Sequence, residues 1–160
     1  MKTSILIMAA ALLISLNFYG QEVKDLPAGV KTAFIQKFPN ATGVKWGKEN
    51  AKEWEAEFKM DGKDYSANFD NAGGWMETEY QVTVSELPAA VKATLDKESA
   101  GSKIKLSEVT ETKDGKAFEF VLNKGENKTE LVIDNSGKVT KMEQLKEENE
   151  NDEKEDKEGN

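Results

Sequence analysis

A short segment near the start of the chain occurs a second time in its later half. Residues 26–31 read Leu-Pro-Ala-Gly-Val-Lys, and residues 87–92 read Leu-Pro-Ala-Ala-Val-Lys. The sequence after each copy leads to an Asp-Asn-x-Gly turn, at residues 70–73 and 134–137. An internal repeat of this kind indicates that one supersecondary unit occurs twice. The predicted fold class is α+β: two tandem copies of a helix followed by an antiparallel β-meander of about four strands, with the helices packed on one face of the sheet.

Each copy of the repeated segment is expected to begin a helix. Proline is favoured at the first helical position, because its missing N–H would have no partner there. The apolar residues that follow recur at spacings of three and four, as on the buried side of an amphipathic helix. They are Val30, Phe34 and Phe38 in the first copy, and Leu87, Val91 and Leu95 in the second.

The segment 53–60, Glu-Trp-Glu-Ala-Glu-Phe-Lys-Met, alternates strictly between charged and apolar residues. A period of two with one charged side is typical of a half-buried antiparallel strand. Similar but weaker patterns predict the remaining strands. These lie at residues 44–46, 64–69, 75–84, 106–112, 117–123, 129–133 and 138–145.

The charged side of this strand carries Glu53, Glu55 and Glu57. A metal or glycosidase site would need carboxylates that converge, whereas these three are expected to lie in a line along the strand. We therefore interpret them as a charged surface that discourages edge pairing. The three tryptophans could stack on a sugar, but we expect them to pack in the core, where aromatic side chains contribute much of the buried area.

The chain divides into four predicted segments. Residues 1–20 combine Lys2, an apolar run and a terminal Gly, which is the order of a secretory signal peptide. The apolar run is short for a membrane span, so we expect a periplasmic or secreted protein with no membrane span after cleavage. Residues 21–84 and 85–145 are the first and second repeats. Residues 146–160 lack apolar side chains and are rich in Glu and Asp, which predicts a disordered acidic tail.

Composition excludes several classes of function. The net charge of -8 disfavours nucleic acid and anionic membrane surfaces as partners. The chain contains neither His nor Cys, which removes Ser-His and Cys-His catalysis, haem ligation by His, zinc sites built on these residues and iron–sulfur clusters. We expect a protein that is not an enzyme and has no cofactor and no metal site. A carboxylate-dependent hydrolase remains an alternative.

The second half offers a candidate partner surface. In the strands at residues 117–123 and 129–133, the larger apolar residues are expected to face the helix. Val121, Val132, Glu119 and Glu130 then lie on the outer side. Exposed apolar residues often mark a contact with the other copy or with another protein, although isolated surface valines are also common.

The repeated Leu-Pro-Ala-x-Val-Lys segment, the Trp-x-Ala-x-Phe strand and the Asp-Asn-x-Gly turn resemble the PepSY-like, beta-lactamase-inhibitor-like proteins secreted by bacteria of the Bacteroidetes type. The resemblance covers residues 23–145. It implies a helix on an antiparallel sheet in each half, with the two sheets separate or joined, and a role in binding or inhibiting other proteins outside the cytoplasm. The true beta-lactamase inhibitory proteins have disulfides, so their inhibitory activity does not carry over to a chain without Cys.

The predicted function is therefore a secreted or periplasmic, non-enzymatic PepSY-like binding module, protein-binding or inhibitor-like, whose partner is an extracytoplasmic protein. The alternative is an acidic protein of the cell envelope that binds or buffers divalent cations. It would use the tail and the row Glu53, Glu55 and Glu57. The sequence leaves the oligomeric state open.

Overall fold

The computed structural model describes residues 25–145, so the predicted signal peptide and the predicted acidic tail lie outside the described residues. In chain order the elements are α1 (Ala28–Lys37), β1 (Thr42–Lys48), β2 (Glu53–Met60), β3 (Lys63–Asp70), β4 (Trp75–Gln81), the short 3₁₀-helix η1 (Val84–Glu86), α2 (Ala89–Glu98), β5 (Lys103–Thr112), β6 (Gly115–Lys124), β7 (Asn127–Asp134) and β8 (Val139–Leu145). Among these residues, no helix is long and apolar enough to cross a membrane.

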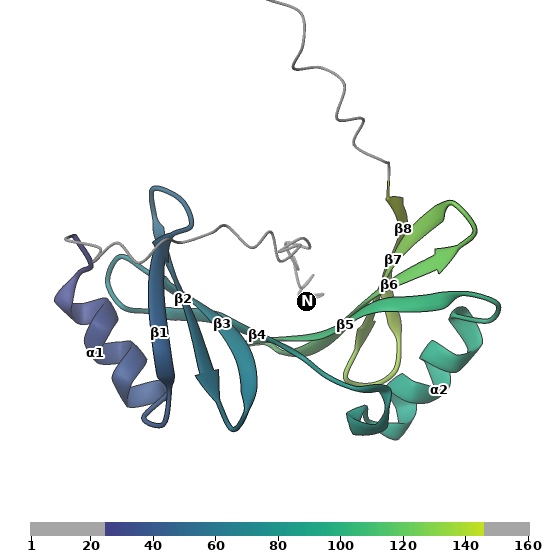
Figure 1. Cartoon of the computed structure of the whole chain (residues 1–160), viewed down its shortest axis with the longest axis horizontal. Helices are drawn as coiled ribbons and strands as arrows, with labels where there is room; N and C mark the ends of the chain where they lie inside the picture. The colour runs from purple at the N-terminus through teal and green to yellow at the C-terminus, as the bar shows by residue number, and fades with distance from the viewer. Residues whose placement is uncertain (1–24, 146–160) are drawn as a thin grey trace, which may run out of the picture.

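The predicted fold class was wrong in its arrangement. The chain does not form two tandem units of a helix and four strands. It forms one antiparallel sheet of eight strands in the order β1 to β8, with two helices, so that it is α+β overall but mostly β (Figure 1). The physical reason is the pairing of β4 with β5, in which Glu77 to Gln81 lie opposite Thr112 to Glu108. This pairing satisfies backbone groups that would otherwise lie on two open edges.

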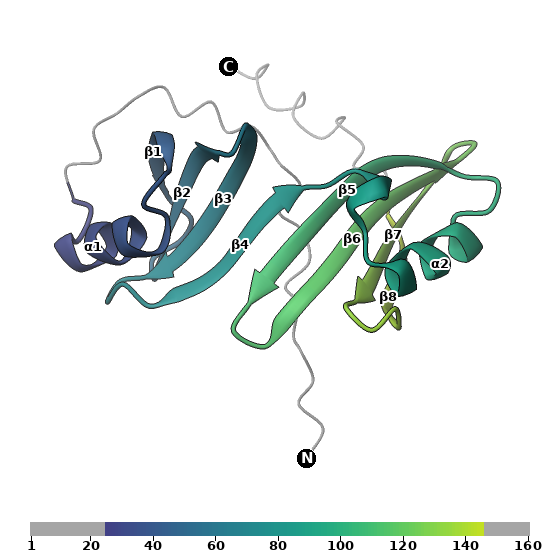
Figure 2. The same ribbon diagram turned by 90° about the horizontal axis from the view of Figure 1, so that it is seen from below.

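Both helices pack on the same face of the sheet, which we call the helix face. Val30 and Phe34 of α1 are buried over β2 and β3, and Val91 and Leu95 of α2 are buried over β5 to β7. Figure 2 shows the two helices near opposite ends of the sheet. The apolar residues identified from the helical spacing are therefore confirmed as core residues, each helix with its own cluster.

A pair of tyrosines connects the two clusters across the middle of the sheet. Tyr65 of β3 lies opposite Tyr80 of β4, and Tyr80 lies opposite Val109 of β5. The two tyrosine rings are 5.0 Å apart between centroids, a normal distance for packed aromatic rings. One row of side chains on the helix face thus continues from the first cluster into the second.

The tryptophans also serve the core, as predicted. Trp54 is 4% exposed, and Trp46 and Trp75 pack against the same cluster under α1. The ring N–H of Trp54 donates a hydrogen bond of 2.8 Å to Oδ1 of Asn71, in the turn after β3. A buried indole N–H needs such a partner, so this contact also fixes the position of the turn.

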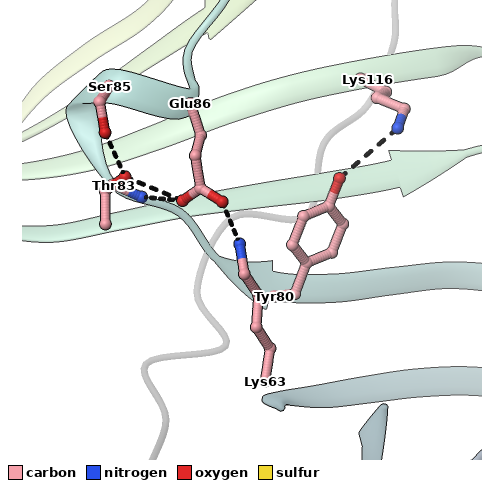
Figure 3. Close-up of polar contacts among 6 residues, drawn as sticks. All are labelled: Lys63, Tyr80, Thr83, Ser85, Glu86 and Lys116. Atoms are coloured by element: carbon pink, nitrogen blue, oxygen red, sulfur yellow. Dashed lines mark hydrogen bonds and ion pairs between the residues drawn. The ribbon is translucent and has the colours of Figure 1, made fainter. Parts of the chain in front are cut away.

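A polar network holds the segment between β4 and α2 (Figure 3). Glu86 in η1 accepts a hydrogen bond of 2.8 Å from the backbone N–H of Thr83. It also forms an ion pair with Lys63 of β3. The contact with Lys63, followed by those with Thr83, lowers the pKa of Glu86 to about 2. Nearby, Lys116 of β6 approaches the hydroxyl oxygen of Tyr80 at 3.5 Å. The first set of contacts connects η1 with β3, and the second connects β6 with β4.

The turn at Asp70 to Gly74 packs directly against the start of α1. A Cβ atom on Gly73 would lie 2.7 Å from the backbone oxygen of Gly29, and the residue has a φ of +91°. Oδ1 of Asp70 accepts hydrogen bonds from the N–H groups of Ala72 and Gly74, which holds the turn in place. Gly137 makes the same close approach to the backbone oxygen of Ala90 in α2.

We predict that Gly73→Ala destabilises the protein more than Gly62→Ala does. Both residues have positive φ, which costs a non-glycine residue about 1–3 kcal/mol, but nothing lies within 4 Å of a Cβ on Gly62. The difference in the free energy of unfolding, measured with urea, therefore isolates the contact with α1 and is expected to be about 1 kcal/mol or more. Equal losses for the two variants would contradict the close approach.

Candidate functional site

The face of the sheet opposite the helices, which we call the open face, gathers carboxylates from both halves of the chain. Side chains alternate between the two faces of a strand, and the strand pairing places these glutamates on one face of strands between β2 and β6. We call five of them the glutamate cluster: Glu55 on β2, Glu77 and Glu79 on β4, Glu108 on β5 and Glu119 on β6.

The register brings like charges close together. Glu108 lies directly opposite Glu119, and Glu79 is the diagonal neighbour of Glu108, because Glu79 pairs with Thr110 and Gln81 pairs with Glu108. Side chains at such positions interact, and like charges directly opposite one another are destabilising. Glu108 is also 6% exposed, so water screens its charge poorly.

The environment raises the pKa values of these carboxylates. Burial, followed by the charges of Glu77, Glu108, Glu119 and Glu55, raises the pKa of Glu79 to about 8. Burial and neighbouring glutamates raise the pKa of Glu55 to about 7 and the pKa of Glu108 to about 7. The pKa values of Glu77 and Glu119 are raised for the same reasons.

Polar neighbours give the cluster limited compensation. Thr110 Oγ1 lies 3.4 Å from Oε1 of Glu79, and the side-chain amide of Asn68 donates a hydrogen bond of 3.3 Å to Oε1 of Glu77. Within residues 25–145, no lysine forms an ion pair with any of the five carboxylates of the cluster. The ion pairs of the open face lie at its periphery, where Lys59 contacts Asp64 and Lys141 contacts Glu130.

The four residues of the predicted partner surface lie together on the open face. Val121 pairs with Glu130 and Glu119 pairs with Val132, so they form one patch on β6 and β7. The patch is less exposed than the sequence suggested, since Val132 is 1% exposed and Glu130 is 4% exposed. Its role as a contact surface stays a prediction.

A role in a site was not predicted from the sequence for Glu77, Glu79 or Glu108. The alternation of Glu77 and Glu79 along β4 was a usable signal, because it places both on the same side as Glu55 once β3 is paired between them. The position of Glu108 depends on the pairing of β4 with β5, which connects residues far apart in the chain.

Glu55 and Glu57 lie in a line along β2, as expected for a charged strand surface. In the part of the chain that the structure describes, no group of three or more acidic side chains is arranged to hold a metal ion.

Comparisons with known proteins identify relatives. The model of a family described as "Putative beta-lactamase-inhibitor-like, PepSY-like" matches residues 52–141, more than half of the chain. A search of curated proteins found no match.

Three solved structures share the fold. A BLIP-like protein from Bacteroides fragilis has a TM-score of 0.70 and 20% identity, over 78% of this chain and 90% of that one. A DUF2874 family protein from Bacteroides uniformis has a TM-score of 0.69 and 21% identity, over 74% and 88%. A structure described as "putative periplasmic proteins" from Bacteroides eggerthii has a TM-score of 0.68 and 20% identity, over 74% and 88%.

We predict that the free energy of unfolding falls as the pH rises from about 5 to about 8. The folded protein retains protons on Glu55, Glu79 and Glu108 in this range, whereas the unfolded chain releases them near the ordinary value of 4.5. The folded state binds more protons, so stability is lost with rising pH. The lowered pKa of Glu86 acts below this range.

Urea unfolding at several pH values measures how the free energy of unfolding changes with pH. Glu79→Gln, which keeps a neutral side chain of similar shape, is expected to make this change smaller. Asp96→Asn, which removes an exposed carboxylate of α2, serves as the matched control. A wild-type stability that rises from pH 5 to pH 8 would contradict the prediction.

Proposed function

The chain belongs to the PepSY-like, beta-lactamase-inhibitor-like family, and we propose that it acts outside the cytoplasm as a non-enzymatic module that binds another protein through the open face. One observation carries the proposal. Both helices cover the same face of the sheet, and no other element of residues 25–145 covers the opposite face. The open face therefore offers a surface that extends over several strands and that a partner protein can contact.

The open face is built for recognition rather than for packing. Its side chains stand on paired strands, so their positions are fixed by the backbone hydrogen bonds of the sheet and little order has to be gained on binding. Polar and charged residues dominate the face, whereas the large apolar residues of the strands point to the helices. A rigid polar surface of this kind suits a reversible contact with a second folded protein.

Two further points support the location and the lack of catalysis. The predicted signal peptide directs export from the cytoplasm, and a structural neighbour from Bacteroides eggerthii is described as a putative periplasmic protein. The chain has no His and no Cys, and the glutamates of the open face follow the register of the strands rather than converging on one point. A BLIP-like protein from Bacteroides fragilis shares the fold, which fits a binding role.

Site-specific photocrosslinking in the secreting cell tests the proposal. A photoreactive amino acid at Gln81, an exposed position of the open face, is expected to capture a distinct protein. The same probe at Ile35, which is 55% exposed on α1, is the matched control on the other side of the molecule. Capture of the same protein from Ile35 and not from Gln81 would overturn the assignment of the open face.

A further inference from the structure

The charge pattern of the open face indicates the chemistry of its partner. The five carboxylates of the glutamate cluster occupy the middle of the sheet, and lysines of this face lie on the edge strands or near strand ends. These lysines are Lys45 on β1, Lys59 on β2, Lys103 on β5, Lys128 on β7 and Lys141 on β8. The centre of the open face is therefore acidic, and its margin carries both positive and negative charges.

A second observation, independent of the carboxylate cluster, also points to a ligand. Glu130 is 4% exposed, and although its Oε2 contacts Lys141 at 2.7 Å, its Oε1 has no hydrogen-bond partner. Asn123 Oδ1, also buried, has none either. Register places Asn123 diagonally next to Glu130 on the open face. Glu130 is also the diagonal neighbour of Glu119 on this face, because Glu119 pairs with Val132 and Val121 pairs with Glu130.

Both unpartnered atoms are acceptors. A buried acceptor without a donor costs free energy, and a ligand that supplies donors recovers it. Lysine and arginine side chains carry donors and no acceptors, and the guanidinium group of arginine pairs with a carboxylate through two parallel hydrogen bonds. The same groups supply the positive charge that the glutamate cluster lacks.

We propose that the partner of the open face is a basic protein segment, whose lysine or arginine side chains pair with the glutamate cluster and donate to the buried oxygens of Glu130 and Asn123. This inference rests on the proposed function and specifies its partner. The arrangement of the cluster on four strands, β2, β4, β5 and β6, requires a segment that crosses the strands.

Binding of such a segment releases protons. Near pH 7.5 the free protein holds a proton on Glu79 most of the time, because its pKa is raised to about 8, and holds protons on Glu55 and Glu108, whose pKa values are raised to about 7, for a smaller part of the time. A nearby cation favours the ionised carboxylate and lowers those pKa values. The other charged groups that lie on this face or act on the cluster are Lys45, Glu49, Glu53, Glu57, Lys59, Asp64, Asp70, Glu77, Lys103, Glu119, Lys128, Glu130, Asp134, Lys141 and Glu143.

The test uses the full chain and a hexa-arginine peptide, with hexaglutamine as the neutral control. Isothermal titration at pH 7.5 in buffers of different ionisation enthalpy measures both the affinity and the protons released. The double variant Glu79→Gln/Glu108→Gln is expected to weaken binding about tenfold and to reduce the proton release, because it removes two carboxylates from the centre of the open face.

The matched control is Glu153→Gln/Glu155→Gln, which removes the same number of carboxyl groups from the segment 146–160. We expect less than about a twofold change in affinity for this control. NMR shifts on peptide addition should appear in β4 to β6. A larger loss from the control variant, or shifts confined to residues 146–160, would overturn the proposal.

Two other outcomes would also overturn the proposal of a basic partner, and each would support a different conclusion. If crosslinking from Gln81 captures a protein equally well in the wild type and in Glu79→Gln/Glu108→Gln, the open face binds a partner but not through basic side chains. If Ca²⁺ alone shifts the NMR signals of β4 to β6 and the peptide does not, the cluster binds a divalent cation instead.

Discussion

The pairing of β4 with β5 is the contact on which the rest of the structure depends. It joins strands from the two halves of the chain into one sheet of eight strands. On the helix face it brings Tyr80 beside Val109, so the contact between Tyr65 and Tyr80 bridges the two clusters under α1 and α2. On the open face it brings Glu79 beside Glu108. The same strand pairing therefore creates both the bridge between the two clusters and the concentration of glutamates.

The two faces have opposite effects on stability. The helix face buries Phe69, Phe120 and Leu95 completely or nearly so, and burial of such side chains contributes about 1.5–3 kcal/mol each. The open face brings glutamates together, and the fold compensates by leaving protons on them near neutral pH. A surface that is unfavourable in the free protein and favourable with a cationic partner is consistent with selection for binding rather than for stability.

Local features of the fold could be predicted from the sequence, and long-range pairing could not. Strand β2 has the predicted bounds because its alternation is strict, and α1 begins directly after Pro27 as its sequence indicates. The predicted fourth strand was too long at its end. Thr83 and Glu86 form a capping box there that starts η1 instead of continuing β4. The joining of β4 and β5 depends on contacts between distant residues, which local periodicity does not determine.

The candidate site shows the same division between local and distant information. Alternation placed Val121 and Glu119 on the outer side of β6, and the structure agrees. Alternation could not show that Val132 is almost fully buried, nor that the strongest charge concentration lies on β4 and β5. Since the valines offer little exposed apolar area, the proposed recognition at this face would depend chiefly on charge. Charge complementarity contributes more to the rate and specificity of association than to affinity. Such a face favours rapid, reversible and salt-sensitive binding.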